Sequence, residues 1–246
     1  IHFAHRTFSW KNEAKGNAAV HCVIIGFGLQ DIESKRLFDY IDIKGEPGEK
    51  KLKNINPYLA AGNDLIVLKR SQSLCNIPKM SKGSQPTDGG NLLMTDEEKY
   101  QYVQQEPAGE KFIRSFISSD EFLNGRNRWC FWMTNIQPNE LKQLPLLLRR
   151  VEAIKQMRLA SPKLATVKWA QFPTVFTENR QPDSNYVLIP RHSSENRKYI
   201  PIGFFDKSNI VADSCNYISD ATLYHFGMLT SEMHMTWVRY VCGRLE

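Results

Sequence analysis

Near its amino terminus the chain reads Phe3-Ala-His-Arg-Thr-Phe-Ser-Trp-Lys-Asn-Glu-Ala-Lys-Gly-Asn-Ala-Ala-Val-His-Cys-Val-Ile-Ile-Gly-Phe27, and this stretch decides the fold there. Residues 1–8 and 18–27 are rich in β-branched and aromatic side chains, and the polar residues 9–17 separate them. Such a pattern is typical of two strands joined by a turn. The sequence therefore predicts a β-hairpin.

The region after the hairpin is expected to be irregular. A turn is predicted at residues 54–58 and a short strand at 65–69. Residues 78–91 hold two prolines and three glycines, which favours a long loop.

Helical patterns dominate the middle of the chain. Thr95 or Asp96 can cap a helix that runs to Glu106. A strand-like run at 129–134 precedes Pro138, which suits the first turn of another helix. One stripe of that helix would carry four apolar residues: Leu141, Leu144, Leu148 and Val151.

The last third is expected to combine strands and helices. The predicted strands are 186–190, 199–205 and 209–218, and the predicted helices are 221–229 and 232–241. Thr230 or Ser231 is the expected N-cap of the last helix. Because strands and helices do not alternate as in a parallel sheet, the expected fold class is α+β, with mixed sheets, hairpins and helices.

Composition restricts the class of protein. With 246 residues, 41% of them hydrophobic, the chain is long and apolar enough to build a core. Its longest apolar runs are far shorter than the roughly 20 residues that span a bilayer, so no membrane partner is expected. Five widely spaced cysteines without a C-x-x-C pair favour reduced thiols, a cytoplasmic protein and no metal site. Because the chain starts inside a strand pattern and stops on a helical one, it is interpreted as a fragment of a larger polypeptide.

The positive charge is concentrated in one block. Residues 142–199 contain eleven Lys and Arg against four Asp and Glu, a net charge of +7, whereas the whole chain carries +6. Such a block favours a polyanionic partner, with nucleic acid ahead of a membrane. From charge alone, a solvated charged surface explains it equally well.

Motif searches exclude several chemistries. Residues 26–28 lack the third glycine of a dinucleotide-binding turn. Residues 56–58, Asn-Pro-Tyr, are similar to the amino-methyltransferase tetrapeptide but lack its second proline, so they are interpreted as a turn. Glu-x-Lys, the spacing of Mg²⁺-dependent nucleases, occurs at 13–15, 33–35 and 97–99, but no upstream Pro-Asp accompanies it and chance explains it better.

Together, these stretches resemble one family. Residues 3–27 closely resemble the late strands of the catalytic domain in MmeI-like DNA methyltransferases, which are adenine methylases often fused to restriction. The likeness continues along nearly the whole chain, through residues 54–59, 86–92, 110–114, 149–152, 158–161, 188–191, 197–204, 221–227 and 233–239.

The resemblance implies a division of labour. Residues 1–30 would be the last hairpin of the catalytic domain, and residues 31–246 the DNA target recognition domain, which runs into a helical C-terminal region. The parent protein would be an adenine-N6 DNA methyltransferase that uses S-adenosyl-L-methionine on a base flipped out of double-stranded DNA. The family's cofactor and catalytic loops lie upstream of the matching residues, so we expect no catalytic residue here and no activity from this fragment alone. Mg²⁺ is expected only if the parent carries a nuclease.

Two kinds of DNA contact are expected. Phosphate contacts are sequence-blind and sensitive to salt. The candidates in the basic block are Arg149, Arg150, Arg158, Lys163 and Lys168. Weaker candidates in the glycine-rich loop are Lys82, Ser84 and Gln85, with Thr87 and Asp88 beside them.

Base-reading contacts need side chains that match the base edges, such as Arg for guanine, Asn for adenine and Glu for the cytosine amine. The polar turn between two predicted strands supplies them: Arg191, His192, Ser193, Ser194, Glu195, Asn196, Arg197 and Lys198. The start of the last helix adds Thr230, Ser231, Glu232 and His234. The alternatives are an ordinary polar hairpin turn and simple helix capping.

The hairpin offers a weaker candidate site. Phe8 and Trp10 are aromatic side chains that can stack on a flipped base, although core packing explains them at least as well. Asn12, Glu13 and Lys15 lie in the same polar connection and are expected to border the target-base pocket.

Two other function classes stay open. A stand-alone binding module for RNA or non-specific DNA would keep the basic block without needing the hairpin. A Mg²⁺-dependent nuclease would use one of the Glu-x-Lys pairs.

Overall fold

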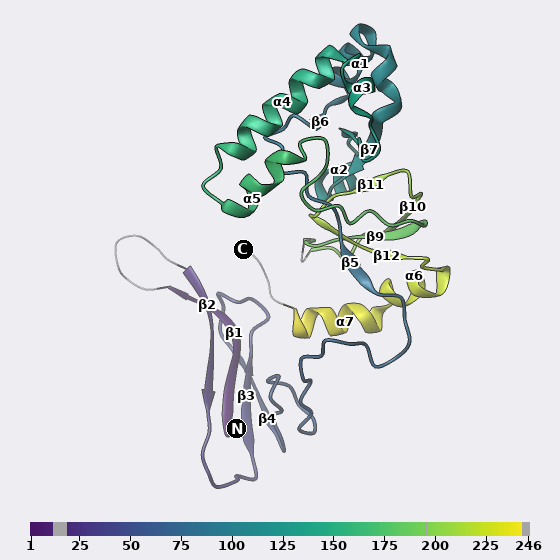
Figure 1. The fold of residues 1–246 in the computed structure, drawn as a ribbon. Coiled ribbons are helices and arrows are strands. Elements are labelled where there is room, and N and C mark those ends of the chain that lie inside the picture. The colour runs from purple at the N-terminus through teal and green to yellow at the C-terminus, as the bar shows by residue number, and fades with distance from the viewer. Residues whose placement is uncertain (12–18, 195, 243–246) are drawn as a thin grey trace. The chain divides into compact units, whose positions relative to one another are not determined.

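The computed structural model describes residues 1–11, 19–194 and 196–242, and it divides into two compact units, Ile1–Leu74 and Cys75–Glu246. Both units contain strands, and the second also contains the helices (Figure 1). The expected α+β class is therefore confirmed.

The first unit is a four-stranded sheet in the order β2-β1-β3-β4. Its strands are β1 (Phe3–Lys11), β2 (Ala19–Gly26), β3 (Lys35–Asp39) and β4 (Gly48–Leu52). The predicted hairpin is present because β1 and β2 pair antiparallel, whereas β1 and β3 pair parallel. At Gly26, opposite Phe3, a Cβ atom would lie 2.0 Å from the Phe3 ring, so a larger residue there would require this exposed ring to turn away.

The first unit has a small core. Ala4, Leu37 and Ile55 are buried in it. The apolar residues of β2 stay exposed, namely Val20, Val23, Ile24 and Ile25. The prediction of a strand at residues 65–69 is wrong. These residues are exposed and pair with no strand of the described chain, and the Val67 amide instead donates to the Tyr58 hydroxyl at 2.6 Å.

The second unit contains two four-stranded sheets. The first, in the order β11-β7-β8-β6, consists of β6 (Leu93–Met94), β7 (Ile113–Ile117), β8 (Trp129–Phe131) and β11 (Ile210–Val211). The second, in the order β10-β9-β12-β5, consists of β5 (Met80–Lys82), β9 (Tyr186–Pro190), β10 (Gly203–Phe205) and β12 (Cys215–Ser219).

Most helices of the second unit lie toward one of its two ends, and one lies between them (Figure 1). The helices are α1 (Asp96–Gln105), α2 (Ser119–Asn124), α3 (Pro138–Leu141), α4 (Pro145–Leu159), α5 (Leu164–Lys168), α6 (Leu223–Leu229) and α7 (Glu232–Val241), with 3-10 turns at Pro107–Phe112 and Trp169–Gln171. None of the helices in the described part of the chain is long and apolar enough to cross a membrane.

Two expectations about this unit need correction. The helix predicted from Pro138 is broken, because Pro145 cannot donate a backbone hydrogen bond and instead begins α4. The loop predicted at 78–91 contains β5, since Met80–Lys82 pairs with the edge of β12. Helix α1 agrees with expectation: Thr95 is its N-cap and forms a capping box with Glu98.

The core of the second unit is large. Helix α4 buries Leu147, Val151 and Ile154 at spacings of three and four residues, against side chains such as Met94 and Phe131. A separate cluster between β9, β11 and β12 includes Tyr186, Leu188, Val211, Cys215 and Tyr217. These cores make the second unit a rigid support for its surface loops.

Candidate nucleic-acid interface

Five charged side chains lie together at β5, at the segments before and after β9, and at the turn before β12. This charged cluster consists of Lys82, Glu178, Arg180, Arg191 and Asp213. Lys82 Nζ lies 3.2 Å from Glu178 Oε2 and 4.0 Å from Asp213 Oδ2, and Arg180 Nε lies 3.1 Å from Glu178 Oε2. Arg191 Nη1 donates to the Asp213 carbonyl at 3.1 Å. Exposed fractions of 31% for Lys82, 36% for Glu178 and 49% for Arg180 leave the cluster open to a partner.

The backbone beneath the charged cluster is closely packed. A Cβ atom at Gly83 would lie 2.2 Å from the Ala212 carbonyl oxygen, so only glycine permits this approach. The Ser84 amide donates to Val211, and the Asp213 amide donates to Ser84. Gln85 and Glu178 exchange two backbone hydrogen bonds of 2.9 and 3.1 Å. The cluster is therefore fixed by the fold rather than by its own ion pairs.

These contacts show which phosphate-binding candidates of the glycine-rich loop are accessible. Ser84 is fully buried and its hydroxyl accepts the Arg180 amide, so its assignment to phosphate contact is wrong. Gln85 is half-buried, and its carbonyl accepts the Thr177 hydroxyl as well as the Glu178 amide. Lys82 keeps an accessible ammonium group, but two carboxylates already lie beside it.

Arg158, expected to contact phosphate, is instead the largest fully buried side chain of the described residues, with 0% exposure. Its guanidinium donates to five backbone carbonyls at 2.8–3.1 Å: those of Pro86, Thr87, Trp169, Phe172 and Val175. Burial lowers the pKa of this guanidinium, and the charge of Asp88 opposes the shift. A group so enclosed cannot reach DNA, so the sequence-based assignment is corrected.

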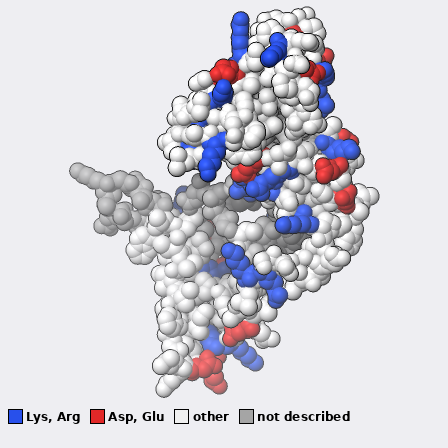
Figure 2. Space-filling model, in the orientation of Figure 1, with Lys and Arg blue, Asp and Glu red and all other residues white. Residues whose placement is uncertain are grey.

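The other basic candidates lie on or after α4. Arg149, Lys163 and Lys168 are exposed, and in the described part of the chain no carboxylate pairs with them. Arg150 is half-buried, donates to the Asn91 carbonyl at 3.1 Å and lies over the Phe131 ring. Figure 2 shows Lys and Arg side chains along the face that carries α4, α5 and the sheet of β5, β9 and β12. Three of the four cations are thus free to meet phosphates.

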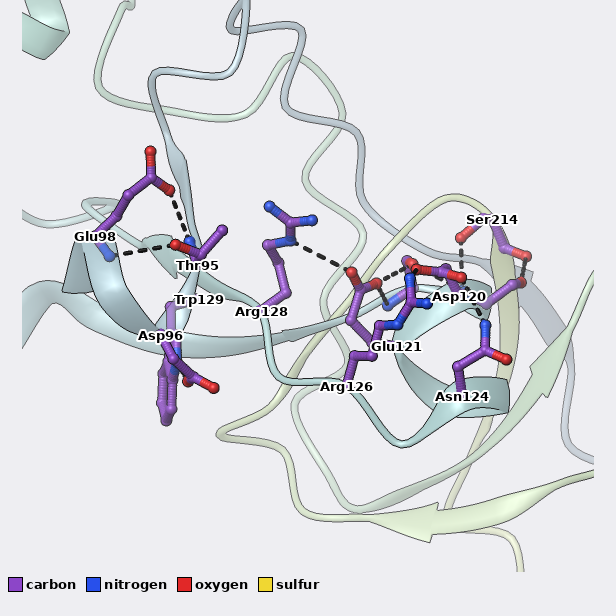
Figure 3. Close-up of polar contacts among 12 residues, drawn as sticks. Thr95, Asp96, Glu98, Asp120, Glu121, Asn124, Arg126, Arg128, Trp129 and Ser214 are labelled. Atoms are coloured by element: carbon purple, nitrogen blue, oxygen red, sulfur yellow. Dashed lines mark hydrogen bonds and ion pairs between the residues drawn. The ribbon is translucent and has the colours of Figure 1, made fainter. Parts of the chain in front are cut away.

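The cations around α2 are different, because carboxylates hold them (Figure 3). Arg126 pairs with Asp120 at 3.1 Å, and Arg128 pairs with the buried Glu121 at 3.3 Å. Ser214, next to Asp213, accepts the Ser119 amide through its hydroxyl at 3.0 Å. This network anchors the start of β12 to α2 and neutralises its own positive charge.

The polar turn of residues 191–198 lies between β9 and β10, as predicted. The side chains at its start are exposed, namely Arg191, His192, Ser193 and Ser194, as are Asn196 and Lys198, whereas Arg197 is half-buried and Glu195 lies outside the described residues. Arg239 on α7 donates to the Lys198 carbonyl at 2.9 Å and so ties the end of the turn to the fold.

The start of α7 is occupied by capping contacts. Ser231 is the N-cap, and its hydroxyl accepts the His234 amide at 3.1 Å. Thr230 donates to the Phe226 carbonyl, and His234 Nδ1 bonds to the Leu229 carbonyl at 2.8 Å. Glu232 is exposed. The side chains of Thr230, Ser231 and His234 thus all form hydrogen bonds within the fold. Among the four base-reading candidates at this helix, only Glu232 has no such side-chain contact in the described part of the chain.

An aromatic cluster covers one part of the first unit. His5 stacks on Phe38 with ring centroids 4.2 Å apart, and Phe8 stacks on Tyr40 at 5.2 Å. Tyr40 also forms a 2.8 Å hydrogen bond with His5 Nδ1. Trp10 lies at the edge of this cluster and is 52% exposed. Trp10 is therefore the accessible aromatic side chain, whereas Phe8 is held in a stack; Asn12, Glu13 and Lys15 lie outside the described residues.

Sequence reasoning singled out neither Glu178, Arg180 nor Asp213. Glu178 pairs with Lys82 from 96 residues away, and Asp213 lies beside Lys82 from still farther along the chain, so no local pattern reports the cluster. One signal was available: the triplet Glu178-Asn179-Arg180 repeats residues 195–197 of the predicted base-reading turn.

Two family models match parts of the chain. The family model "MmeI, target recognition domain" matches residues 61–246, and "MmeI, DNA-methyltransferase domain" matches residues 1–39. These matches define the class: the end of a DNA-methyltransferase domain followed by a target recognition domain. The chain belongs to the MmeI family.

Two relatives cover the whole chain. "DNA methyltransferase A" of Bacillus subtilis (strain 168) is 37% identical over 246 residues, and the chain spans 27% of it. The solved structure of the type IIL restriction-modification enzyme MmeI in complex with DNA is 49% identical with a TM-score of 0.87, and the chain spans 33% of it. The chain thus corresponds to between a quarter and a third of these relatives.

Proposed function

We propose that this chain contains the sequence-reading part of a DNA methyltransferase, preceded by the end of the methyltransferase domain, and that it binds double-stranded DNA. The charged cluster is the observation that carries this proposal. It presents three cations and two carboxylates on a fixed backbone, in a chain 49% identical over its whole length to MmeI, which was solved in complex with DNA. We further propose that the parent uses S-adenosyl-L-methionine to methylate adenine at N6.

Base reading is assigned to the charged cluster and the turn of residues 191–198. Arg180 and Arg191 carry planar donor pairs that suit guanine, and the carboxylates of Glu178 and Asp213 suit the cytosine amine. Phosphate binding is assigned to Arg149, Lys163 and Lys168, which are exposed and have no carboxylate partner in the described part of the chain. Separate groups thus position the DNA and read its sequence.

Target-base contact is assigned to Trp10. Its ring is half exposed at the end of β1, beside the connection that holds Asn12. An exposed aromatic face can stack on a base that has left the duplex. Phe8, stacked on Tyr40, would support Trp10 from behind. The division of domains near residue 30 stays a prediction.

Among the described residues, the glycine pair of residues 26–28 lacks the third glycine of a dinucleotide-binding turn. Asp31, the acidic residue that follows this pair, lies on the surface with its side chain 84% exposed and pairs with Lys35 at 2.9 Å. We therefore assign cofactor binding and the catalytic loop to other parts of the parent and derive no step through them.

The nuclease alternative finds no support in two of its three Glu-x-Lys pairs. Lys35 is buried and bonded to Asp31 and Asn54, and Lys99 lies over the Trp129 ring at 3.4 Å. Neither lysine is available to orient a metal-bound water. The third pair, at residues 13–15, lies outside the described residues.

The test is methylation of mixed-sequence DNA by the full-length parent with S-adenosyl-L-methionine, followed by sequencing for modified adenine. A single modified motif is the expected result. Unmodified DNA from folded, cofactor-bound protein would overturn the proposal, and preferential binding of hairpin RNA over duplex DNA would favour the stand-alone module instead.

Two variants then separate the assigned roles. Arg191→Ala should cost about 1–3 kcal/mol and relax the preference at one base pair, because a base contact is lost. Lys168→Ala should weaken all sequences alike and reduce the slope of log affinity against log salt by about 0.9, because one phosphate contact is lost. Equal weakening of every site by Arg191→Ala would contradict the division of roles.

A further inference from the structure

Arg158 connects two segments that are distant in sequence. Nη2 donates to the Pro86 and Val175 carbonyls, both at 2.9 Å, and so bridges the segments directly. Nε adds the Thr87 carbonyl, and Nη1 adds those of Trp169 and Phe172. One side chain from α4 therefore holds residues 86–87 against residues 169–175.

The binding of this guanidinium is unusual because carbonyls, not carboxylates, satisfy it in the described chain. Burial lowers the pKa of the Arg158 guanidinium and the charge of Asp88 opposes that shift, but the Asp88 carboxylate itself accepts a hydrogen bond from the Leu92 amide at 2.5 Å. Only arginine offers five N–H donors in a planar fork, whereas lysine offers three from one atom. The site thus requires arginine for its geometry as much as for its charge.

Both segments lead directly into the charged cluster. Gln85, which precedes Pro86, exchanges two backbone hydrogen bonds with Glu178. Lys82 lies three residues before Gln85 in the same segment. Beyond residue 175, the chain reaches Glu178 and Arg180, whose side chains are paired at 3.1 Å. Thr87 and Thr177 also share a 2.8 Å hydrogen bond across the two segments. Arg158 is therefore placed to set the spacing between Lys82, Glu178 and Arg180.

We propose that Arg158 is a positioning residue for sequence recognition: it never touches DNA, but it holds the two segments whose ends present Lys82, Glu178 and Arg180 to the bases. This inference rests on the proposed function. Small displacements are costly at such a site, because hydrogen bonds to base edges weaken steeply with misalignment.

The experiment uses the full-length protein with Arg158→Lys, which keeps the charge and loses the fork. Ile154→Ala is the matched control, since Ile154 is fully buried on the same helix one turn away. Thr177→Val is a milder second variant that cuts the contact between the two segments and leaves Arg158 intact. Each protein is incubated with a randomised duplex DNA library to select its preferred motif, and amide hydrogen exchange is measured without DNA, at a temperature where all are folded.

The expected result is that Arg158→Lys lowers motif enrichment about tenfold or more, the range that one bidentate base contact carries. The amides of Gln85 and Glu178 should exchange faster in the same variant. Thr177→Val should change both readouts in the same direction by less, whereas Ile154→Ala should lower the melting temperature and keep the motif.

Undiminished enrichment by folded Arg158→Lys, or by Thr177→Val if Arg158→Lys does not fold, would overturn the inference. An equal loss of the motif by Ile154→Ala would do the same, because general destabilisation would then explain it. Failure of the proposed function looks different: the unmodified protein itself would select no motif.

Discussion

The two units of the chain each contain four-stranded sheets, yet they differ in how much apolar surface they bury. The first unit centres on Ala4, Leu37 and Ile55 and leaves much of β2 exposed. The second unit wraps α4 and two sheets around an extended core. Burial of apolar surface is the main favourable contribution to folding. The second unit therefore has an extended core of its own, whereas the first unit has a small core and an exposed apolar strand.

The largest expected difference between the two units is in their thermal unfolding when each is produced as a separate fragment. Residues 75–246 alone should unfold cooperatively on heating, whereas residues 1–74 alone should show no cooperative transition, because three buried side chains do not offset the loss of chain entropy. Calorimetry of the two fragments measures this. A sharp transition in residues 1–74 would break the comparison.

Core truncation should also separate the units. Ile154→Ala in α4 removes a fully buried side chain and should lower the free energy of unfolding by about 2–5 kcal/mol. Ile25→Ala on the exposed strand β2 should change it by less than about 0.5 kcal/mol. Chemical denaturation of residues 1–246 gives both values. A large loss for Ile25→Ala would mean that β2 is packed in solution.

A smaller effect is expected at the support of the charged cluster. Gly83→Ala would place a methyl group 2.2 Å from the Ala212 carbonyl, and relief of that clash should cost about 1–3 kcal/mol and displace Lys82. Gly227→Ala in α6 is the control, because Gly227 lies in open space and has no positive φ. Thermal melts and DNA selection together test the pair. Unchanged stability and motif in Gly83→Ala would show that the approach can relax.

The smallest effect concerns a surface carboxylate at the start of α1. Asp96 accepts a hydrogen bond of 2.7 Å from Trp129, which lies beside it in Figure 3, and one of 3.1 Å from Asn127. These hydrogen bonds hold the pKa of Asp96 below its ordinary value. Because the pKa is lower in the folded state, the stabilisation is present above the ordinary Asp pKa and is lost as the pH falls through the lowered one.

Asp96→Asn should therefore lower the melting temperature of the second unit slightly at neutral pH and make no difference in strong acid. The melting temperature of both proteins across the acid range measures this. A difference that grows as the pH falls would contradict the sign.

Local patterns predicted the elements well where the chain itself carries the signal. The boundaries of β9 and α7 follow from runs of apolar residues bounded by Pro190 and Ser231. Capping chemistry likewise located α1 at Thr95. Local patterns failed at Pro145, which divides a helical stripe into two helices, and at residues 65–69, whose strand-like composition finds no partner strand.

The candidate site was predicted only in part. The exposed turn that begins at Arg191 and the exposed cations Lys163 and Lys168 agree with the expected placement on the surface. Arg158 and Ser84 were assigned to DNA because residue type reports what a side chain can bind, not whether solvent can reach it. Burial depends on packing between segments that are far apart in the chain.

The sequence by itself determined the α+β class, the basic block and the membership suggested by its resemblance to the MmeI family, since composition, periodicity and motif are local properties. Only the tertiary structure decided that Glu178, Arg180 and Asp213 join Lys82 and Arg191. It alone decided that Arg158 turns inward. The physical reason is that both outcomes depend on backbone hydrogen bonds and close packing between segments far apart in the chain, such as residues 83–85 and 211–215, which no window of sequence contains.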